Sequence, residues 1–274
     1  MTLKTDGALV LAGAGNMGAA LLAGWLERGL DPSAVLIQDP SPPPATLALL
    51  ERYRLHASPR LAAPSAPPAV IVVAVKPQIM DEVFPELARH AGARTVVLSI
   101  AAGRTLAGFE RHLEAKRAVV RAMPNTPAAI ARGITVAVAN AYVTPAQRQL
   151  CDALLKAVGE VEWVADEGLL DPVTAVSGSG PAYVFYLAEC LAAAGIEAGL
   201  APDLAMKLAR HTVSGAGELL ARASASPASL RASVTSPKGT TFAALEVLMG
   251  TDGLARLMRE AVHAATRRSR ELAK

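Results

Sequence analysis

The chain has few of the residues that usually build covalent cross-links or metal sites. Its 274 residues include only two cysteines, Cys151 and Cys190, which lack any ligand-type spacing. The five histidines are scattered and form no His-x-His or His-Glu-x-x-His group. We therefore expect no disulfide framework and no structural or catalytic metal. The two cysteines are interpreted as reduced packing residues, as in a cytoplasmic protein.

Aromatic residues and long apolar runs are also scarce. Phe, Trp and Tyr make up 4% of the chain, too few for the stacking platforms that bind single-stranded nucleic acid. The net charge of +3 comes from arginines spread along the sequence, and the basic cluster at residues 267–270 is typical of a solvated helix end. No uninterrupted apolar run can span a membrane, and residues 1–6 lack a secretory signal pattern. We expect no nucleic-acid or membrane partner and a cytoplasmic location.

The first half of the chain alternates apolar, β-type runs with helical stretches. The runs expected to form strands are residues 8–12, 35–37, 70–75, 95–100, 118–121, 135–139 and 161–164. Such alternation predicts a parallel sheet that is covered by helices on both faces. Many prolines lie between residues 40 and 68, and they predict stiff surface loops without regular structure.

The character of the sequence changes after residue 165. From Asp166 onward strand signals are almost absent, and helical stretches rich in Ala and Leu cover residues 181–199, 202–222 and 253–273. We therefore predict two domains, residues 1–165 and 166–274, of which the second is all helical. Its abundant apolar surface predicts that it completes its core against a partner subunit, so a homodimer is expected.

A glycine-rich loop, Gly13-Ala-Gly15-Asn16-Met17-Gly18, follows the first predicted strand and opens a helix. In this context the Gly-x-Gly-x-x-Gly pattern predicts a dinucleotide site. The first glycine permits a tight turn, the second lets the pyrophosphate approach the backbone, and the third lets the helix pack on the strand. The helix N-terminus then faces the phosphates. The predicted fold class is α/β, with an N-terminal Rossmann-type doubly wound sheet followed by an all-helical C-terminal dimerisation domain.

Asp39 ends the second predicted strand, where an acidic side chain usually hydrogen-bonds the adenosine ribose. Its charge would repel a 2′-phosphate, and residues 40–45 contain no arginine or lysine to bind one. The local sequence therefore favours NADH over NADPH. The alternative is that Asp39 only starts a turn before Pro40.

Two further segments lie at the ends of predicted strands, where open α/β sheets bind ligands. The first holds Ala74, Val75, Lys76 and Pro77, and Lys76 either faces the cofactor or is solvated. The second is the Met-Pro-Asn-Thr-Pro segment at residues 123–127. Its Asn125 and Thr126 are each expected either to hydrogen-bond the nicotinamide carboxamide or ribose, or to cap their own turn.

Two hydroxyl-rich motifs lie in the predicted helical domain. The motif that begins with Ser177 precedes the first long helix, where Ser179 or Gly180 is expected as the cap. The motif Ser-Pro-Lys-Gly-Thr-Thr at residues 236–241 precedes a later helix. Backbone N–H groups at a helix start can bind a carboxylate, and the hydroxyls can donate to a neighbouring atom. The alternative for both motifs is a plain helix cap.

Six motifs, taken in order along nearly the whole chain, resemble the pyrroline-5-carboxylate reductase family. They are residues 13–18, 75–78, 99–103, 121–127, 176–183 and 234–241, and the last two are the most specific. The resemblance implies reduction of 1-pyrroline-5-carboxylate to L-proline by NADPH or NADH, the last step of proline biosynthesis. It also implies a helical domain that interlocks two subunits, with dimers often assembled into decamers.

The resemblance also implies roles for individual residues. Thr241 matches the threonine that hydrogen-bonds the ring nitrogen and is the candidate catalytic residue, while Ser177 matches the opposite wall of the pocket. The loop that holds the substrate carboxylate corresponds to Ser236, Lys238, Gly239, Thr240 and Thr241. Lys238 stands where many relatives have glycine. If that position needs a positive φ, lysine costs about 1 kcal/mol there, although its charge can attract the carboxylate.

The implied chemistry agrees with the absence of an obvious catalytic His or Lys, because an imine can be protonated from solvent before it accepts hydride. Three alternatives stay open. One is a reductase of a related cyclic imine. Another is a β-hydroxyacid dehydrogenase, whose catalytic lysine would fall at Val184, four residues after Gly180. The third is a sensor that binds nicotinamide cofactor without turnover, which leaves residues 236–241 without a role.

Overall fold

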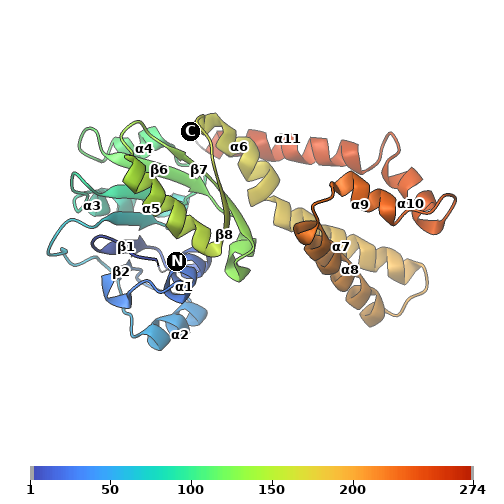
Figure 1. The fold of residues 1–274 in the computed structure, drawn as a ribbon, viewed down its shortest axis with the longest axis horizontal. Helices are drawn as coiled ribbons and strands as arrows, with labels where there is room; N and C mark the ends of the chain where they lie inside the picture. Colours follow the sequence, from blue (N-terminus) through green and yellow to red (C-terminus); the bar gives the residue numbers. More distant parts are fainter. Residues whose placement is uncertain (1–2, 273–274) are drawn as a thin grey trace. The chain divides into compact units, whose positions relative to one another are not determined.

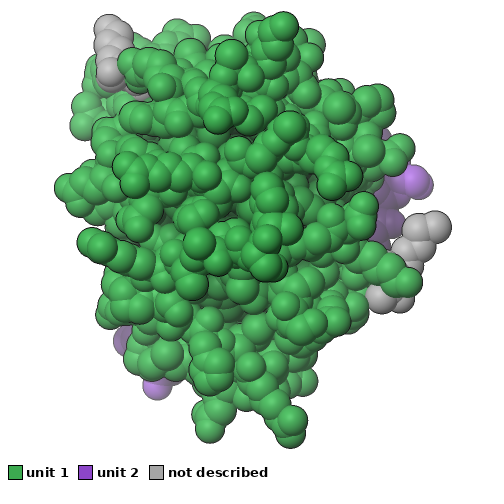
Figure 2. All heavy atoms as spheres, turned by 90° about the vertical axis from the view of Figure 1, so that its left-hand side faces the viewer, with its two compact units in different colours: residues 1–178, 266–274 green, residues 179–265 purple. Residues whose placement is uncertain are grey.

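The computed structural model describes residues 3–272, which belong to two compact units (Figures 1 and 2). Unit 1 is Met1–Gly178 together with Thr266–Lys274, and unit 2 is Ser179–Ala265. The sequence predicted a boundary after residue 165, where the strand signals end. The compact units divide later, after Gly178, because residues 166–178 pack against unit 1.

Unit 1 is built on an eight-stranded sheet. Its strands are β1 (Leu9–Ala12), β2 (Val35–Gln38), β3 (Ala57–Ser58), β4 (Val70–Val73), β5 (Val96–Ser99), β6 (Ala118–Met123), β7 (Gly133–Ala139) and β8 (Gly159–Trp163). Their order across the sheet is β3-β2-β1-β4-β5-β6-β7-β8. The order reverses between β1 and β4, which confirms the predicted doubly wound sheet and creates the switch point where such sheets bind ligands.

Two strands, β7 and β8, depart from the predicted parallel arrangement. β7 runs antiparallel to β6, with Arg121 opposite Val138, whereas the other neighbouring strands are parallel. The connection between β6 and β7 holds only the short helix η3 (Thr126–Ile130). A parallel pair would need a crossover of about a dozen residues or more. Buried strands of either direction have similar apolar runs, so the sequence pattern did not separate the two cases.

Helices cover both faces of this sheet. They are α1 (Asn16–Glu27), α2 (Pro44–Tyr53), α3 (Met80–Ala88), α4 (Leu106–Glu110), α5 (Pro145–Leu155) and α6 (Leu170–Val173), with short helices η1 (Pro32–Ala34), η2 (Pro77–Ile79), η4 (Lys156–Val158) and η5 (Glu167–Leu169). The prediction that the proline-rich stretch lacks regular structure was wrong, since it contains α2 and β3. Pro43 and Pro44 stand at the start of α2, where a missing N–H removes no helical hydrogen bond.

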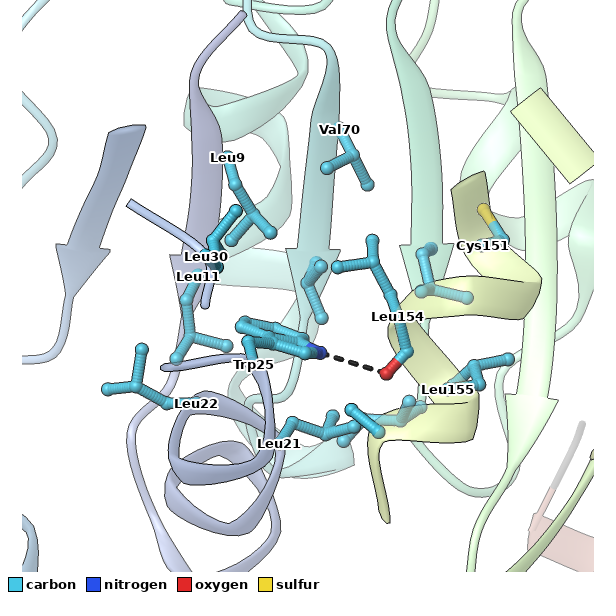
Figure 3. Close-up of a cluster of buried hydrophobic side chains, with 14 of the residues drawn as sticks. Leu9, Leu11, Leu21, Leu22, Trp25, Leu30, Val70, Cys151, Leu154 and Leu155 are labelled. Carbon is cyan, nitrogen blue, oxygen red and sulfur yellow. Dashed lines mark hydrogen bonds between the residues drawn. The ribbon is translucent and has the colours of Figure 1, made fainter. Parts of the chain in front are cut away.

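Two hydrophobic clusters occupy the two faces of the sheet. Leu9 and Leu11 join the cluster that contains α1 and α5, whereas Val10 joins the one that contains α3 and α4. In the first cluster the fully buried Trp25 of α1 donates its indole Nε1–H to the Leu154 carbonyl of α5 at 2.9 Å (Figure 3). This packing fixes α1, and with it the position of the glycine loop.

Unit 2 is helical. It contains α7 (Gly180–Glu197), α8 (Pro202–Arg222), α9 (Pro227–Ser233), α10 (Thr240–Leu248) and most of α11 (Leu254–Leu272). The three long predicted helices are confirmed, and residues 166–272 contain no strand. α7 and α8 approach closely through small side chains, since a Cβ on Gly195 would lie 3.4 Å from the Cβ of Ala205. No described helix is both long enough and apolar enough to cross a membrane.

We predict that Trp25→Phe lowers the free energy of unfolding by about 1–3 kcal/mol, because it removes both buried volume and a buried hydrogen bond. The matched control is Trp163→Phe. The Trp163 indole is only half-buried and donates to the Asp152 carboxylate at 3.1 Å. Chemical denaturation of both variants checks the prediction, and an equal loss in both would contradict the central place given to Trp25.

Candidate active site

The glycine loop after β1 has the geometry that its spacing predicts. Gly13 has φ +91°, and a Cβ on it would lie 2.7 Å from the Ala74 carbonyl. A Cβ on Gly18 would lie 2.1 Å from the Gly13 oxygen, so only glycine lets α1 pack this closely on the turn. Gly15 faces open space, with no atom within 4 Å of its Cβ position. The tight turn, the open space for a pyrophosphate and the close packing of the helix on the strand are therefore all present.

The open space beside Gly15 borders the N-terminus of α1. Gly15 is the N-cap residue, and no side chain caps the helix there. The first amide groups of a helix, here including those of Asn16 and Met17, lack intrahelical acceptors. These N–H groups and the positive end of the helix dipole favour a phosphate. The residues present therefore fit the pyrophosphate of a dinucleotide.

Asp39 ties the loop after β2 to the glycine loop. Its Oδ2 accepts from the Ala14 amide at 2.7 Å, and its Oδ1 accepts from the Ser41 amide at 2.8 Å. The second bond is the turn that the alternative interpretation predicted, while the first reaches the nucleotide loop. A carboxylate has lone pairs beyond these two bonds, so ribose hydroxyls can still donate to it. Sequence reasoning missed Thr46 of α2, whose hydroxyl donates to the Ala14 carbonyl at 2.9 Å.

The segments after β4 and β6 reach the same edge of the sheet. The Ala74 amide donates to the Ala12 carbonyl at 2.7 Å, which places residues 74–77 beside the glycine loop, and Lys76 is exposed. Asn125 precedes η3, which packs against α1. Its Oδ1 accepts from the Ile134 amide at 3.0 Å, so it bonds to β7 and does not cap its own turn. The predicted cofactor-binding residues are therefore brought together.

Ser177 lies in a π-helical segment, η6 (Thr174–Gly178), that leads into α7. Its buried hydroxyl oxygen has no hydrogen-bond partner among the described residues. Such groups are rare in folded proteins, and π-helical turns are frequent at functional sites. Ser179 is the N-cap residue of α7, but its side chain makes no capping bond. Capping therefore does not explain the hydroxyls of this motif.

The end of β6 contacts this π-helical segment. A Cβ on Gly178 would lie only 2.5 Å from the Cε of Met123. The segment therefore lies against the Met123 side chain, two residues before Asn125. The sequence predicted no role for Met123 or Gly178, because a contact between segments distant in sequence cannot be recognised from the residues of either motif.

In unit 2, the loop at residues 236–241 forms the start of α10. Lys238 has φ +57°, so the condition set for its strain is confirmed. Gly239 is the N-cap residue, its amide donates to the Ser236 carbonyl at 3.0 Å, and no side chain caps the helix. The amides of Thr240, Thr241 and Phe242 therefore stand in the first turn without intrahelical acceptors. Half-buried Thr241 places a hydroxyl in that same turn.

The two thiols have different environments. Cys151 is buried, and burial together with the neighbouring Asp152 raises the pKa of its thiol to about 12, so it is a neutral packing group. Cys190 is exposed within the chain, contrary to the packing role predicted for it. Between residues 3 and 272, no three His, Cys, Asp or Glu side chains gather in a way that could hold a metal ion.

The fold and the edge of the sheet define a dinucleotide-binding protein with a Rossmann-type N-terminal domain and a helical C-terminal domain. A family model for pyrroline-5-carboxylate reductase dimerisation matches residues 167–272, and one for NADP oxidoreductase, coenzyme F420-dependent, matches residues 8–103.

Full-length relatives point the same way. Pyrroline-5-carboxylate reductase from Synechocystis is 41% identical over 97% of this chain and 98% of its own, and that from Pseudomonas aeruginosa is 38% identical over 97% and 96%. A pyrroline-5-carboxylate reductase structure from Coxiella burnetii is 34% identical with a TM-score of 0.89, covering 98% of this chain and 100% of its own. The chain therefore belongs to the pyrroline-5-carboxylate reductase family, which confirms the predicted family, fold class and enzyme class.

We predict that Lys238→Gly raises the free energy of unfolding by up to about 1 kcal/mol, because glycine adopts a positive φ without steric strain. Lys238→Ala is the control, since it removes the charge and retains the Cβ. Thermal denaturation of the two variants compares them directly. If both stabilise the protein equally, the ammonium group and not the backbone is the source of the cost.

Proposed function

We propose that the enzyme transfers hydride from NADH or NADPH to the imine carbon of 1-pyrroline-5-carboxylate and forms L-proline, the last step of proline biosynthesis. The observation that carries the proposal is the first turn of α10, which combines unbonded amides with the Thr241 hydroxyl. The substrate has a carboxylate on the carbon next to its ring nitrogen. Amides for the carboxylate and a hydroxyl for the nitrogen within one helical turn match that arrangement.

In this mechanism the ring nitrogen takes a proton from solvent, and the iminium carbon accepts the hydride that the bound reduced cofactor supplies. The electron pair of the C=N π bond moves to nitrogen, which becomes the amine of proline. The Thr241 hydroxyl accepts a hydrogen bond from the protonated nitrogen, and the amides of the same turn hold the carboxylate. In unit 1 the Ser177 hydroxyl, which has no partner among the described residues, is the further candidate for a substrate contact. The chain thus contributes orientation and charge stabilisation, not a strong acid.

We predict that Thr241→Ala lowers kcat about 10- to 100-fold, the effect of losing a hydrogen bond to a charged group. Cofactor affinity should be nearly unchanged, because the glycine loop is intact. Substrate-dependent loss of nicotinamide absorbance measures the rate, and fluorescence titration measures cofactor binding. Thr241→Ser retains the hydroxyl and should keep most of the activity. An unchanged rate in Thr241→Ala would remove this residue from the mechanism.

We also propose a preference for NADH. The Asp39 carboxylate is held by the Ala14 and Ser41 amides, which keeps a negative charge where a 2′-phosphate would lie. A structure of pyrroline carboxylate reductase from Plasmodium falciparum, 25% identical to this chain over 98% of this chain and 99% of its own with a TM-score of 0.80, was solved with NADP bound. Relatives therefore include a protein that binds the phosphorylated cofactor.

We predict that kcat/KM is about tenfold higher with NADH than with NADPH, which corresponds to about 1.4 kcal/mol of unfavourable charge contact. Steady-state rates with both cofactors check the ratio. Asp39→Asn should bring the NADH-to-NADPH ratio of kcat/KM closer to one, because the asparagine side chain has no charge. Its side-chain oxygen can still accept from the backbone N–H of Ala14. A preference for NADPH in the unmodified enzyme would contradict this role of Asp39.

We propose that the enzyme is a homodimer, with a decamer as a further assembly, formed through unit 2. The buried apolar residues of unit 2 are all alanines, namely Ala192, Ala205 and Ala209. Large apolar side chains stay exposed in the single chain, with Tyr186 66% and Val247 75% exposed. A unit with these features lacks a hydrophobic core of its own, so we infer that a second copy of the chain buries its exposed apolar side chains. The family model for dimerisation matches this region.

Sedimentation equilibrium should give a mass of at least two chains at micromolar concentration. Replacing Tyr186 by Asp introduces a charge into the proposed interface and should shift the mass towards one chain. Tyr142→Asp, at an exposed position of unit 1, is the control. A single-chain mass for the unmodified protein would overturn the dimer.

A cytoplasmic location is part of the proposal, because both cysteines are free thiols and such thiols persist in reducing compartments. The remaining alternatives make different predictions in the same assay. A reductase of another cyclic imine would oxidise cofactor faster with the six-membered homologue. A cofactor sensor would bind NADH without substrate-dependent oxidation. Val184 offers no amine for the β-hydroxyacid dehydrogenase mechanism.

A further inference from the structure

A buried charge lies in a strand that is otherwise apolar. Arg121 is the only ionisable residue of β6 and is 5% exposed. Its guanidinium lies 2.9 Å from the Glu167 carboxylate, which belongs to η5. A buried arginine without a counter-charge is strongly unfavourable, so the two side chains depend on each other. The pair joins β6 to residues 167–178, which we call the connector.

The Glu167 carboxylate also attaches the connector to a second element of the sheet edge. Its Oε1, the atom that binds Arg121, also accepts from the Leu106 amide at 2.8 Å. Leu106 is the first residue of α4, where a negative charge complements the positive end of the helix. One carboxylate oxygen thus holds the connector to both β6 and α4.

The rest of the connector is held along its length. Leu170 is fully buried against Val136 and Val138 of β7. The Ser269 hydroxyl of α11 donates to the Asp171 carboxylate at 2.6 Å. At its far end Gly178 lies against Met123, next to the unpaired hydroxyl of Ser177. Every one of these contacts lies within unit 1.

We propose that the Arg121–Glu167 ion pair is a positioning device for the reaction: it fixes the connector so that the Ser177 hydroxyl keeps its place beside the end of β6. This role requires no contact of the pair with substrate or cofactor. It acts through the connector, because the same strand that carries Arg121 ends at Met123, against which Gly178 packs. This inference rests on the proposed reaction, in which Ser177 lines the substrate pocket.

The first test is Glu167→Gln in the full chain. It should lower kcat/KM for 1-pyrroline-5-carboxylate about 10- to 100-fold, as expected for a small displacement of a substrate-orienting group, and leave the Kd for NADH unchanged. Lys156→Gln is the matched control, since it breaks a pair of 2.8 Å with Asp152 on α5, away from the connector. The control should retain the unmodified rate.

The second test separates positioning from general stability. If the pair acts through Ser177, Glu167→Gln should cost much less activity in a Ser177→Ala background than in the unmodified enzyme, whereas independent effects multiply. The double variant Arg121→Met, Glu167→Gln leaves no unpaired charge. It is therefore assayed in place of Glu167→Gln if that single variant unfolds. Fully multiplicative effects would overturn the proposal.

A third measurement does not depend on activity. Amide hydrogen exchange in Glu167→Gln should increase within residues 167–178 and stay unchanged in β1 and α1. If the unmodified enzyme does not reduce the imine, the proposed function is wrong. Independently of that result, unchanged amide exchange in the connector of Glu167→Gln would overturn the positioning role. If the unmodified enzyme is active and Glu167→Gln matches it in both rate and exchange, the positioning role alone is wrong.

Discussion

The close contact between helix α1 and the turn after β1 is the constraint on which the nucleotide edge of the structure depends. The position of Gly18 leaves no space for a Cβ beside the Gly13 oxygen, and the Trp25 hydrogen bond holds the same helix against α5. The helix N-terminus therefore stays directed at the open space beside Gly15. Asp39 and Thr46 then attach the neighbouring segments to Ala14, so several loops share one rigid edge.

The candidate site residues of each unit are backbone groups and hydroxyls, where many enzymes use a titrating side chain. In unit 1 the start of α1 has uncapped amides and Ser177 has an unpaired hydroxyl, and in unit 2 the start of α10 combines uncapped amides with the Thr241 hydroxyl. This composition suits a reaction in which solvent supplies the proton and the protein supplies orientation. The strain at Lys238 and the unpaired Ser177 hydroxyl are local costs at these candidate segments, and such costs are usually found at functional sites.

Most of the fold, and the backbone geometry of the candidate glycine loop, could be predicted because their signals are local. The glycine loop, the apolar strands and the long helices after residue 180 each follow from adjacent residues. The direction of β7 and β8 could not be predicted, because strand direction depends on the connection. The helix inside the proline-rich stretch could not be predicted either, because proline is compatible with a helix start. The hydrogen bonds of Asn125 with Ile134 and of Glu167 with Arg121 could not be predicted either, because their partners are distant in sequence. Arg121 within an apolar run was the one visible hint of a buried partner.

In the proposed reaction, hydride passes directly from the nicotinamide to the imine carbon of a five-membered cyclic imino acid. The most direct test uses reduced cofactor that carries deuterium on the transferred position of nicotinamide C4, with 1-pyrroline-5-carboxylate as substrate. Direct transfer predicts proline with one deuterium on the ring carbon that was part of the C=N bond, as measured by NMR. Proline without deuterium, or cofactor binding with no proline formed, would contradict it.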